Sequence, residues 1–492
     1  MATVATTLLV TLLHAARRAG REGHSARIAT VFSEKLRGAS ASSARPPATH
    51  RLIVEARRVV ESGRRAVGRS GLTAEWALAA FVITALAFVV WRFNQDGYLG
   101  QPFYYRADKS LMDLYTPALW ANDAGAYVRW HSLYPPLSFV YLKFTSVGRC
   151  YALGDLAGRG CDSLARATLV VVYLINIVLV WASYRVSDAR TAIPRSIAMC
   201  LGLPMLYTLE RGNLLIPCFS CFVLGYGDVI RSRILRWLAL ALSMNFKPYL
   251  GLVALPFILT RRWAWVVGTG ILTVTVYVAT MWIYGSGDPL ELITNESRYA
   301  VTASKDHFAD LYYATSYWPL IRLLQAWPQG LVLASPTVSL AWSWTLTAIL
   351  RMSQVAAIGC VIVGLFRPGA TEVRRLGALV AAVSITAFTT GSAGYAQIFL
   401  LFLVLFEPWR GPTRITILVA SYLLCVPLDY VFLPVRHDHL YSFLGDRTVT
   451  TNFGLSIGQL LRPALLLAVQ WGLISLNVAD LLSPRAQSAL EA

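Results

Sequence analysis

The sequence contains few charged residues. Asp, Glu, Lys and Arg make up 14% of its 492 residues, hydrophobic residues make up 56%, and the mean hydropathy is +0.53. Soluble globular domains carry about 25% charged residues. The composition therefore excludes an ordinary soluble globule and predicts a protein with many membrane-spanning segments.

Motifs of soluble nucleotide-binding folds and of metal sites are also missing from the sequence. No Gly-rich phosphate loop follows a predicted strand, which excludes those nucleotide folds. His437 and His439, with Asp438 between them, resemble half of a metal site, but two histidines are too few ligands and we expect no metal. An enzyme of this composition would use a donor that is carried by a lipid or is present outside the cytoplasm.

Acidic residues are scarce, and the formal net charge is +18. The first 70 residues hold thirteen Lys or Arg against four Glu, a net of +9 and half of the total. Nucleic-acid-binding proteins are often this basic, but no stretch resembles a nucleic-acid fold, and we expect no nucleic-acid partner. We predict that residues 1–75 form a basic, partly disordered cytoplasmic tail that is attracted to membrane lipids.

Seven cysteines are present, and they fall into two groups. Five lie in apolar segments and are expected to be small core residues: Cys200, Cys218, Cys221, Cys360 and Cys425. Cys150 and Cys161 lie in a polar loop that we place outside the cytoplasm. These two either stay free or close a short disulfide, and their spacing does not decide between the alternatives.

Hydropathy predicts about twelve spanning helices within residues 76–475. The predicted spans are 76–91, 166–184, 195–209, 213–230, 234–246, 249–260, 263–284, 338–366, 376–391, 394–406, 414–433 and 452–475. Five basic loops between them fall on one side, which the positive-inside rule assigns to the cytoplasm together with both termini, including the tail 476–492. Two long loops, 92–165 and 285–337, then face outward.

Two of these segments, 234–246 and 249–260, are too short to cross a membrane comfortably. About 12 residues make roughly 18 Å of helix, whereas the hydrocarbon layer is about 30 Å thick. We therefore predict broken or half-depth helices that meet at Asn245–Pro248, where Pro248 removes a backbone donor. Lys247 would be costly there unless it faces a cavity or an anion, and a membrane-embedded phosphate would suit it.

The first external loop concentrates carboxylates and tyrosines. Asp108, Asp113 and Asp123 alternate with four tyrosines, a mixture that suits the apolar faces and hydroxyls of a sugar. The competing interpretation is that these are solvated loop residues. Asp113 differs from the others because its neighbours Leu111, Met112 and Leu114 are apolar, a setting typical of a carboxylate positioned for a task.

Two further groups are candidates with equally simple structural alternatives. Arg211 and Asn213 follow Glu210 at a tight external turn, where such residues either cap a helix and anchor it at head groups or contribute to a site. His307, in a polar stretch, is either a proton carrier or phosphate donor, or a solvated loop residue.

Four stretches together resemble the polyprenyl-phosphate-dependent sugar transferases of the GT-C superfamily, specifically glycosyltransferase family 87, which includes bacterial mannosyl- and arabinofuranosyltransferases. They are Met112–Tyr115 leading to Leu133–Leu137, Arg211–Leu215, Asn245–Tyr249 followed by Arg261–Trp263, and Thr390–Gln397. The resemblance spans roughly residues 76–408. The fourth stretch departs from the family, which often has Ser-Trp and a His there, and Tyr395 and Gln397 stand in that place.

The resemblance implies an all-α, GT-C-like bundle of about 12 transmembrane helices, with a catalytic domain over 76–475. It implies an inverting hexosyl- or pentosyltransferase of the cell membrane that moves one sugar from a polyprenyl-phosphate donor to a hydroxyl of a glycolipid or glycan on the extracytoplasmic face. The lipid-linked donor is a co-substrate, and no cofactor is implied. Asp113 would be the general base. The residues that would bind substrate or stabilise the leaving phosphate are Lys247, Arg211, Asn213, Tyr134, His307, Arg298, Tyr395, Gln397 and Asp108.

Two other functions remain open at this stage. A lipid or solute transporter would use Lys247 and the broken hairpin as its substrate site. A lipid-linked polysaccharide polymerase or ligase would use pyrophosphate-linked oligosaccharides rather than a monosaccharide donor.

Overall fold

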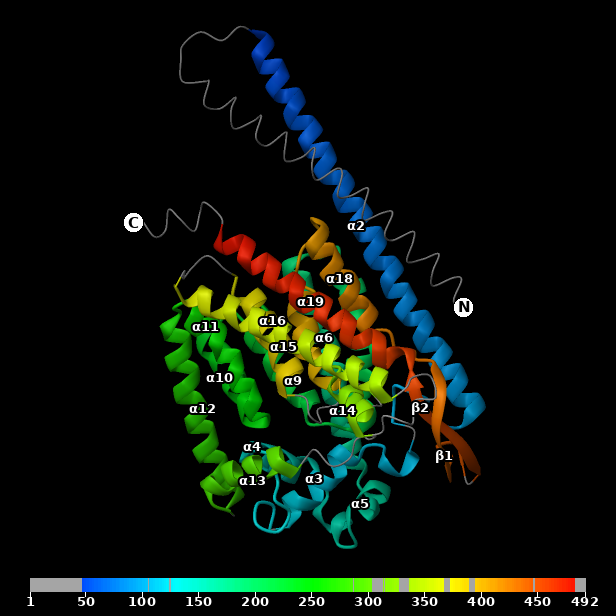
Figure 1. The fold of residues 1–492 in the computed structure, drawn as a ribbon. Helices are drawn as coiled ribbons and strands as arrows, with labels where there is room; N and C mark the ends of the chain where they lie inside the picture. The colour runs from blue at the N-terminus through cyan, green and yellow to red at the C-terminus, as the bar shows by residue number, and fades with distance from the viewer. Residues whose placement is uncertain are drawn as a thin grey trace.

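A computed structural model describes residues 47–104, 106–123, 125–285, 287–302, 313, 315–326, 336–366, 372–388, 394–445 and 447–482. Most of the described chain is helical (Figure 1). In chain order the elements are α2 (Pro47–Asp96), η2 (Ala107–Lys109), α3 (Met112–Asn122), α4 (Pro136–Thr145), η3 (Gly148–Tyr151), α5 (Asp155–Cys161), α6 (Ser163–Ser187), α7 (Ala192–Cys200), α8 (Leu203–Arg211), α9 (Leu215–Tyr226), α10 (Arg233–Phe246), η4 (Pro248–Ala254), α11 (Leu255–Leu259), α12 (Trp263–Tyr284), α13 (Pro289–Thr302), α14 (Trp318–Ala326), α15 (Pro336–Phe366), α16 (Val373–Phe388), η6 (Gly394–Ala396), α17 (Gln397–Val404), α18 (Pro412–Leu424), β1 (Val431–Tyr441), β2 (Thr448–Ser456) and α19 (Ile457–Leu481).

Six stretches of helix in the described chain are long and apolar enough to cross a membrane: Gly71–Asp96, Ser163–Ser187, Ala192–Arg211, Trp263–Tyr284, Thr337–Gly364 and Ile457–Leu481. This confirms a mostly helical protein, and the length and composition of these helices are consistent with a membrane protein. The apolar helices α9, α17 and α18 are shorter, and so are η4 and α11 together. The expected total of about twelve spans stays a prediction, because a short helix crosses the hydrocarbon layer only when neighbouring helices cover its ends.

The expectation of an all-α fold needs one correction. Strands β1 and β2 form an antiparallel hairpin, with Val431 opposite Ser456 and Tyr441 opposite Thr448. The predicted span 414–433 therefore ends as a helix at Leu424, and the helix predicted from 452 begins at Ile457. The β-branched run in β2 favours a strand over a helix, and the residues between the strands form a turn that contains glycine.

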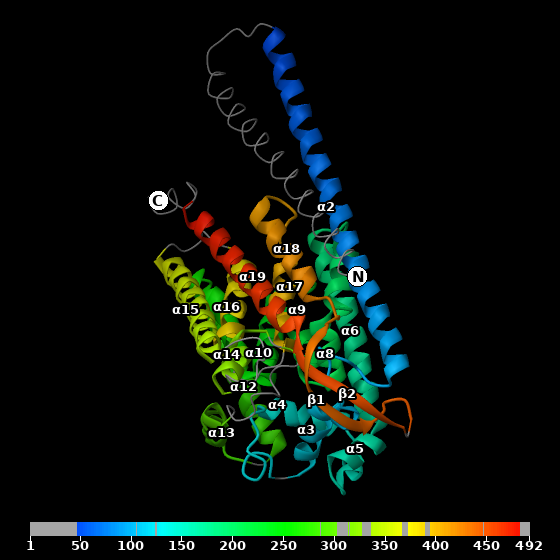
Figure 2. The same cartoon turned by 45° about the vertical axis from the view of Figure 1, so that its right-hand side comes forward.

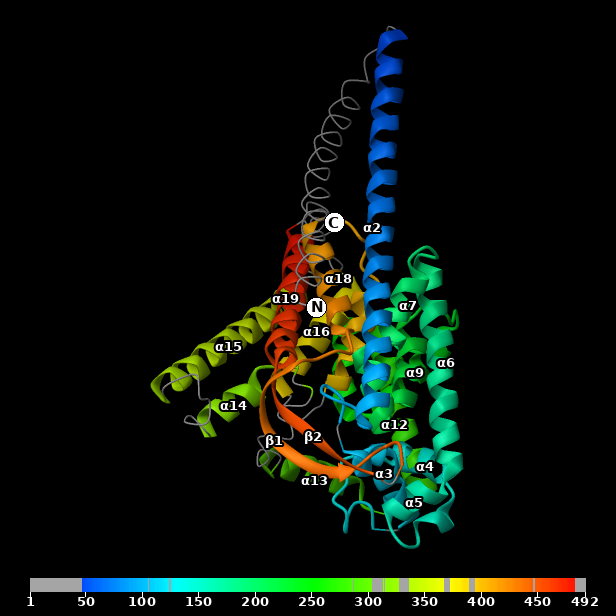
Figure 3. The ribbon, with the colours of Figure 1, turned by 90° about the vertical axis from the view of Figure 1, so that its right-hand side faces the viewer.

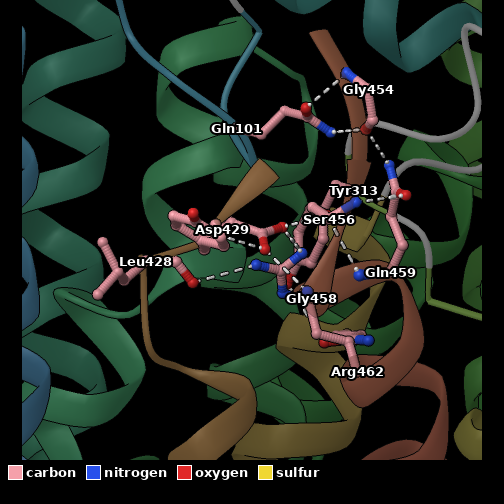
Figure 4. A network of polar contacts seen from close by, with 11 residues as sticks. Gln101, Tyr313, Leu428, Asp429, Gly454, Ser456, Gly458, Gln459 and Arg462 are labelled. Atoms are coloured by element: carbon pink, nitrogen blue, oxygen red, sulfur yellow. Dashed lines mark hydrogen bonds and ion pairs between the residues drawn. The ribbon is translucent and has the colours of Figure 1, made fainter. Parts of the chain in front are cut away.

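A polar network fixes the base of the hairpin to helix α19 (Figure 4). The carboxylate of Asp429 accepts hydrogen bonds from the Ser456 hydroxyl at 2.8 Å, the Gly458 amide at 2.8 Å and the Arg462 guanidinium at 3.0 Å. Ser456 also caps α19 in a capping box with Gln459. Because these donors satisfy a buried carboxylate, the network holds the start of α19 against the chain that leaves α18.

A buried ion pair attaches the first spanning helix to the bundle. Arg195 of α7 donates from Nη2 to Glu75 Oε1 at 2.7 Å and from Nε to Oε2 at 2.9 Å, and neither side chain is more than 4% exposed. Tyr422 of α18 also donates to this carboxylate, at 3.1 Å. Three helices thus share one satisfied charge pair, which makes their relative placement specific.

The chain between the first two spanning helices is folded, although it was expected only as a long loop. It contains α3, α4 and α5, and a disulfide joins Cys150 to Cys161, which settles the alternative left open by the sequence. Asp162 follows the disulfide, is fully buried, and accepts hydrogen bonds from Tyr151 and from the amides of Val147 and Ala165. Disulfide and carboxylate together hold α5 against the start of α6.

Helices α3, α4, α5 and α13 gather with the hairpin at one end of the molecule in Figure 1, and they remain there in Figures 2 and 3. Helix α18 and the beginning of α2 lie at the opposite end. The core runs between these ends, where all eight residues of α17 are buried. Helix α10 reaches the first end, because the Ser138 hydroxyl of α4 donates to the carbonyl of Phe246 at 3.4 Å. This end carries the candidate site.

Candidate active site

The turn that connects α8 to α9 fixes the start of α3, which carries Asp113. The amide of Leu111 donates to the carbonyl of Glu210 at 2.9 Å, and Leu111 itself is left-handed, with φ of 60°. Gly212 has φ of 66°, and a Cβ there would lie 2.9 Å from Cβ of Leu114. Glycine is therefore required at 212 both for its backbone conformation and for the close approach of α3.

The carboxylate of Asp113 is held by two side chains from that same turn. Arg211 Nη2 donates to Oδ1 at 2.5 Å, and Asn213 Nδ2 donates to Oδ2 at 2.9 Å. Asn213 is itself fixed, since its Oδ1 accepts from the amide of Leu215 at 3.1 Å. The side chains of Asp113 and Arg211 remain 22% and 16% exposed. The carboxylate is thus oriented on both oxygens while a substrate can still reach it.

Arg211 is fixed by three contacts. Besides Asp113, its Nη1 donates to the carbonyl of Lys109 at 2.9 Å, and its guanidinium carbon lies 4.7 Å from the centre of the Tyr104 ring. A stacked, paired arginine holds its partner in one geometry. We therefore interpret Arg211 as the residue that orients Asp113.

Lys247 lies at the break between α10 and η4, as the sequence predicted. Its Nζ is 4.1 Å from the centre of the Tyr134 ring, and its charge interacts with the carboxylates of Asp113 and Glu296. Among the described residues no carboxylate lies within 4.0 Å of Nζ. Lys247 is only partly buried, and its cation–π contact contributes about 0.5–2 kcal/mol. The ammonium therefore remains accessible, and it is suited to an anionic ligand.

Tyr134 is placed by the residues around it. The Tyr127 hydroxyl donates to its carbonyl at 2.9 Å, and its own amide donates to the Ser132 hydroxyl at 3.2 Å. Pro135 and Pro136 then begin α4, because proline is accommodated at the first helical position. The Tyr-Pro-Pro sequence thus presents the ring to Lys247 and starts a helix immediately afterwards.

Helix α13 contributes a second carboxylate to this region. Glu296 interacts electrostatically with Lys247. Burial raises the pKa of Glu296 above its usual range, and the charge of Lys247 opposes that shift only in part. Two residues further on, Arg298 Nη1 lies 3.0 Å from Nδ1 of His131. The structure therefore places Arg298, on α13, against the loop before Tyr134.

Tyr395 and Gln397 lie in a cluster of tyrosines. The ring of Tyr395 stacks on that of Tyr207 with 6.0 Å between centres, and the Tyr313 hydroxyl donates to Gln397 Oε1 at 3.3 Å. Tyr395 also interacts with Tyr249, two residues after Lys247. Gln397 is fully buried, and its Nε2 has no hydrogen-bond partner among the described residues; its role in binding substrate stays a prediction.

Three other sequence candidates lie elsewhere or cannot be placed. Asp108 pairs with Arg106 at 3.0 Å, and that interaction and its charge hold the pKa of Asp108 below its usual range although burial opposes this. His307 lies outside the described residues. His437 is on the hairpin, where its Nδ1 lies 2.6 Å from Asn452 Oδ1. The described chain holds no group of three or more His, Cys, Asp or Glu that could bind a metal ion.

An apolar pocket adjoins the break at Lys247. It is a partly open pocket with a cavity volume of about 40 Å³, and it is formed by α9, η4, α16, η6 and α17. The lining residues are almost all apolar: Phe222, Tyr226, Tyr249, Leu250, Leu252, Gly377, Val380, Ala381, Ser384, Ile385, Ala396, Phe399 and Leu403. Such a lining suits a hydrocarbon chain, and it begins two residues from a cation.

Sequence reasoning missed several residues of this region. Glu296 and Tyr249 were not singled out, and Tyr104 was noted only as one of four loop tyrosines. Tyr249 follows Lys247 and Pro248 directly, so its position beside the break was a usable signal. Glu296 had no signal of its own, because only the packing of α13 on the first external segment brings it to Lys247. The chain matches no protein-family model, no curated protein and no solved structure.

Proposed function

We propose that this protein is an integral membrane glycosyltransferase. It moves a single sugar from a polyprenyl-phosphate donor to a hydroxyl group of a glycolipid or glycan acceptor on the extracytoplasmic face. The observation that carries the proposal is an oriented carboxylate, Asp113, whose charge acts on an ammonium, Lys247, that has no ion-pair partner among the described residues. The two groups come from elements more than 130 residues apart, and their charges interact at one end of the bundle.

The chemistry assigns one task to each group. The acceptor hydroxyl gives its proton to Asp113 while its oxygen attacks the anomeric carbon of the donor sugar. The bond between that carbon and the phosphate oxygen breaks, its electron pair stays on the phosphate, and the configuration inverts. Lys247 stabilises the charge that develops on the leaving phosphate monoester. Arg211 and Asn213 keep the base in position through its two oxygens.

The apolar pocket supports a lipid-linked donor. A polyprenyl phosphate has an anionic head on a hydrocarbon chain, and the site offers a cation at Lys247 followed by apolar lining that starts at Tyr249. Each buried CH₂ group contributes about 0.8 kcal/mol, so a prenyl chain binds such a lining favourably. Tyr134 and Tyr395 are assigned to positioning the donor.

The resemblance to glycosyltransferase family 87 is part of the same proposal, and so is the placement of the site outside the cytoplasm. Lys247 at a broken helix also suits a transporter, which would move its substrate without needing Asp113 as a base. A polymerase or ligase would differ in accepting only oligosaccharides linked through pyrophosphate. Both alternatives are separated from the proposal by the assay below.

The test is transfer by the purified protein in lipid nanodiscs. Labelled polyprenyl-phosphate mannose and polyprenyl-phosphate arabinofuranose are offered with a glycolipid extract, and labelled products are resolved by mass spectrometry. The Asp113→Asn variant is expected to fold and to bind donor, but to lose at least about 100-fold in rate, the usual contribution of a general base. Unchanged melting temperature serves as the folding control. Robust turnover by Asp113→Asn, or uptake of either lipid without sugar transfer, contradicts the proposal.

A further inference from the structure

Helix α13 is fixed to the loop that presents Tyr134. Asn295 Nδ2 donates to the carbonyls of Tyr127 at 3.0 Å and Ser132 at 3.3 Å, and Asn295 is buried. The Tyr127 hydroxyl in turn donates to the carbonyl of Tyr134. Helix, loop and tyrosine therefore form one connected unit, and the position of α13 relative to Lys247 is set by buried hydrogen bonds.

This connection brings Glu296, the residue after Asn295, into the electrostatic field of Lys247. The charge of Asp113, on α3, also acts on this ammonium. Lys247 thus has a carboxylate from α3 and another from α13 in its surroundings, and neither makes an ion pair with it within 4.0 Å. Among the described residues Glu296 has no hydrogen-bond donor assigned to its carboxylate, unlike Asp113 with its two.

A carboxylate beside an anion site needs a reason, because it repels the phosphate that the ammonium attracts. Its two oxygens cannot hydrogen-bond to an ionised phosphate, but they accept well from the neighbouring hydroxyls of a sugar. In the donor the sugar is bonded directly to the phosphate. A phosphate at Lys247 therefore places the sugar ring within reach of groups that surround Lys247.

We propose that Glu296 accepts hydrogen bonds from hydroxyl groups of the donor sugar, so that α13 selects which sugar phosphate the site takes. This inference rests on the proposed function. It divides the substrates among three groups: the acceptor hydroxyl at Asp113, the phosphate at Lys247 and the sugar at Glu296. Specificity for the sugar then resides in the second external segment, apart from the residues that perform the transfer.

The experiment measures binding of four lipids to the full-length protein in nanodiscs: decaprenyl phosphate without sugar, and decaprenyl-phosphate mannose, glucose and arabinofuranose. Glu296→Ala is expected to weaken binding of the preferred sugar-bearing lipid by about tenfold or more, because a hydrogen bond to a charged group is lost. The same variant is expected to bind the sugarless lipid as well as the wild type or more tightly, since a repelling charge has gone.

Two further variants sharpen the result. Glu296→Gln keeps an acceptor oxygen and removes the charge, so it should recover part of the affinity for the sugar-bearing lipid. Glu291→Ala is the matched control, because Glu291 lies on the same helix and its carboxylate accepts from the amide of Asp288 at the helix start, at 3.1 Å. Its binding of all four lipids should match the wild type. Binding of the sugarless lipid also reports that each variant is folded.

The outcomes distinguish a failure of this inference from a failure of the proposed function. If wild type binds none of the four lipids, the proposed function fails. If wild type binds them but Glu296→Ala changes the affinities for the sugar-bearing and sugarless lipids equally, or changes neither affinity, the assignment of Glu296 is overturned and the proposed function stands. The assignment also fails if wild type binds every sugar-bearing lipid no more tightly than decaprenyl phosphate.

Discussion

At the scale of single residues, Asp123 shows how hydrogen bonds and a neighbouring positive charge favour the ionised form of a carboxylate. The indole of Trp130 donates to it at 3.0 Å, the amide of Gly125 at 3.2 Å and the guanidinium of Arg129 at 3.1 Å. These donors, the Trp130 indole foremost, lower the pKa of Asp123 below its usual value of 3.8 although burial opposes the shift. The residue closes the loop that leads to Tyr134.

This shift predicts how stability depends on pH. A lowered pKa stabilises the fold above the unfolded-state value near 3.8, and that contribution is lost as the pH falls through the folded-state value. The melting temperature of wild type should therefore exceed that of Asp123→Asn by a constant amount from neutral pH down to about 4, with the difference shrinking below. Scanning fluorimetry between pH 3 and 7 measures it.

Trp130→Phe provides the matched variant. It keeps a ring that can stack on Trp120, whose centre lies 6.2 Å away, but it removes the indole donor. The melting temperature of this variant, plotted against pH, should lie between the curves of wild type and Asp123→Asn. A profile identical to wild type would show that the indole hydrogen bond does not set the pKa.

Residues differed in how far the sequence could identify them. Asp113 stood out because its apolar neighbours set it apart from the other acids of its loop, and Lys247 stood out because Pro248 follows it in a segment too short to span. The structure brings these two together with Arg211, Asn213 and Tyr134. Gln397 is fully buried in the structure. The sequence could not predict this, because a polar residue within an apolar segment can serve either packing or binding.

At the scale of elements, the turn between α8 and α9 sets the geometry around Asp113. Gly212 closes α8 with a left-handed conformation that a side chain adopts at a cost of about 1–2 kcal/mol. A methyl group there would also press against Leu114 of α3. Gly212→Ala should lower the free energy of unfolding by at least that amount, and it should reduce transfer because α3 and its base move away from Arg211.

Gly160→Ala is the control for that substitution. Gly160 lies in α5, has no atom within 4 Å of a Cβ built on it, and should gain slightly from alanine's higher helix propensity. Thermal unfolding and the transfer assay compare the two variants. Equal behaviour of Gly212→Ala and wild type in both measurements would contradict the requirement for glycine at the turn.

Elements were predictable where periodicity and length agreed. Helix α12 was expected over 263–284 and has those bounds, and the break after Phe246 was expected from length and from Pro248. The hairpin was missed because it lies between two apolar helices, with β1 starting shortly after α18 and β2 running directly into α19, so that hydropathy alone extended both helices into it. The helices of the first external segment were missed because α3, α4 and α5 are short and depend on tertiary packing and a disulfide rather than on periodicity.

At the scale of the whole molecule, the end that carries the candidate site and the end from which α10 starts, near Arg231, should face opposite sides of a membrane. Leu153, between η3 and α5, is 92% exposed and belongs to the site end. Arg231 is exposed before α10, whose far end meets α4. Cysteine introduced at Leu153 should react with a membrane-impermeant maleimide in intact cells, whereas cysteine at Arg231 should react only after permeabilisation.

The wild-type protein is the control for this labelling. Cys150 and Cys161 are joined, Cys200, Cys218, Cys360 and Cys425 are buried, and Cys221 is partly buried, so the wild type measures the background, to which Cys221 is the main expected contributor. Reaction of both introduced cysteines from the same side would contradict the topology and, with it, the placement of the site outside the cytoplasm.

The pairing of Glu75 with Arg195 has a consequence for biosynthesis. The two residues are 120 positions apart, so the ribosome delivers the carboxylate well before the guanidinium that neutralises it. An acid that is unpaired in hydrocarbon is expensive, so we expect the first helix to settle only after α7 supplies Arg195. Insertion of α2 is then expected to depend on insertion of α7.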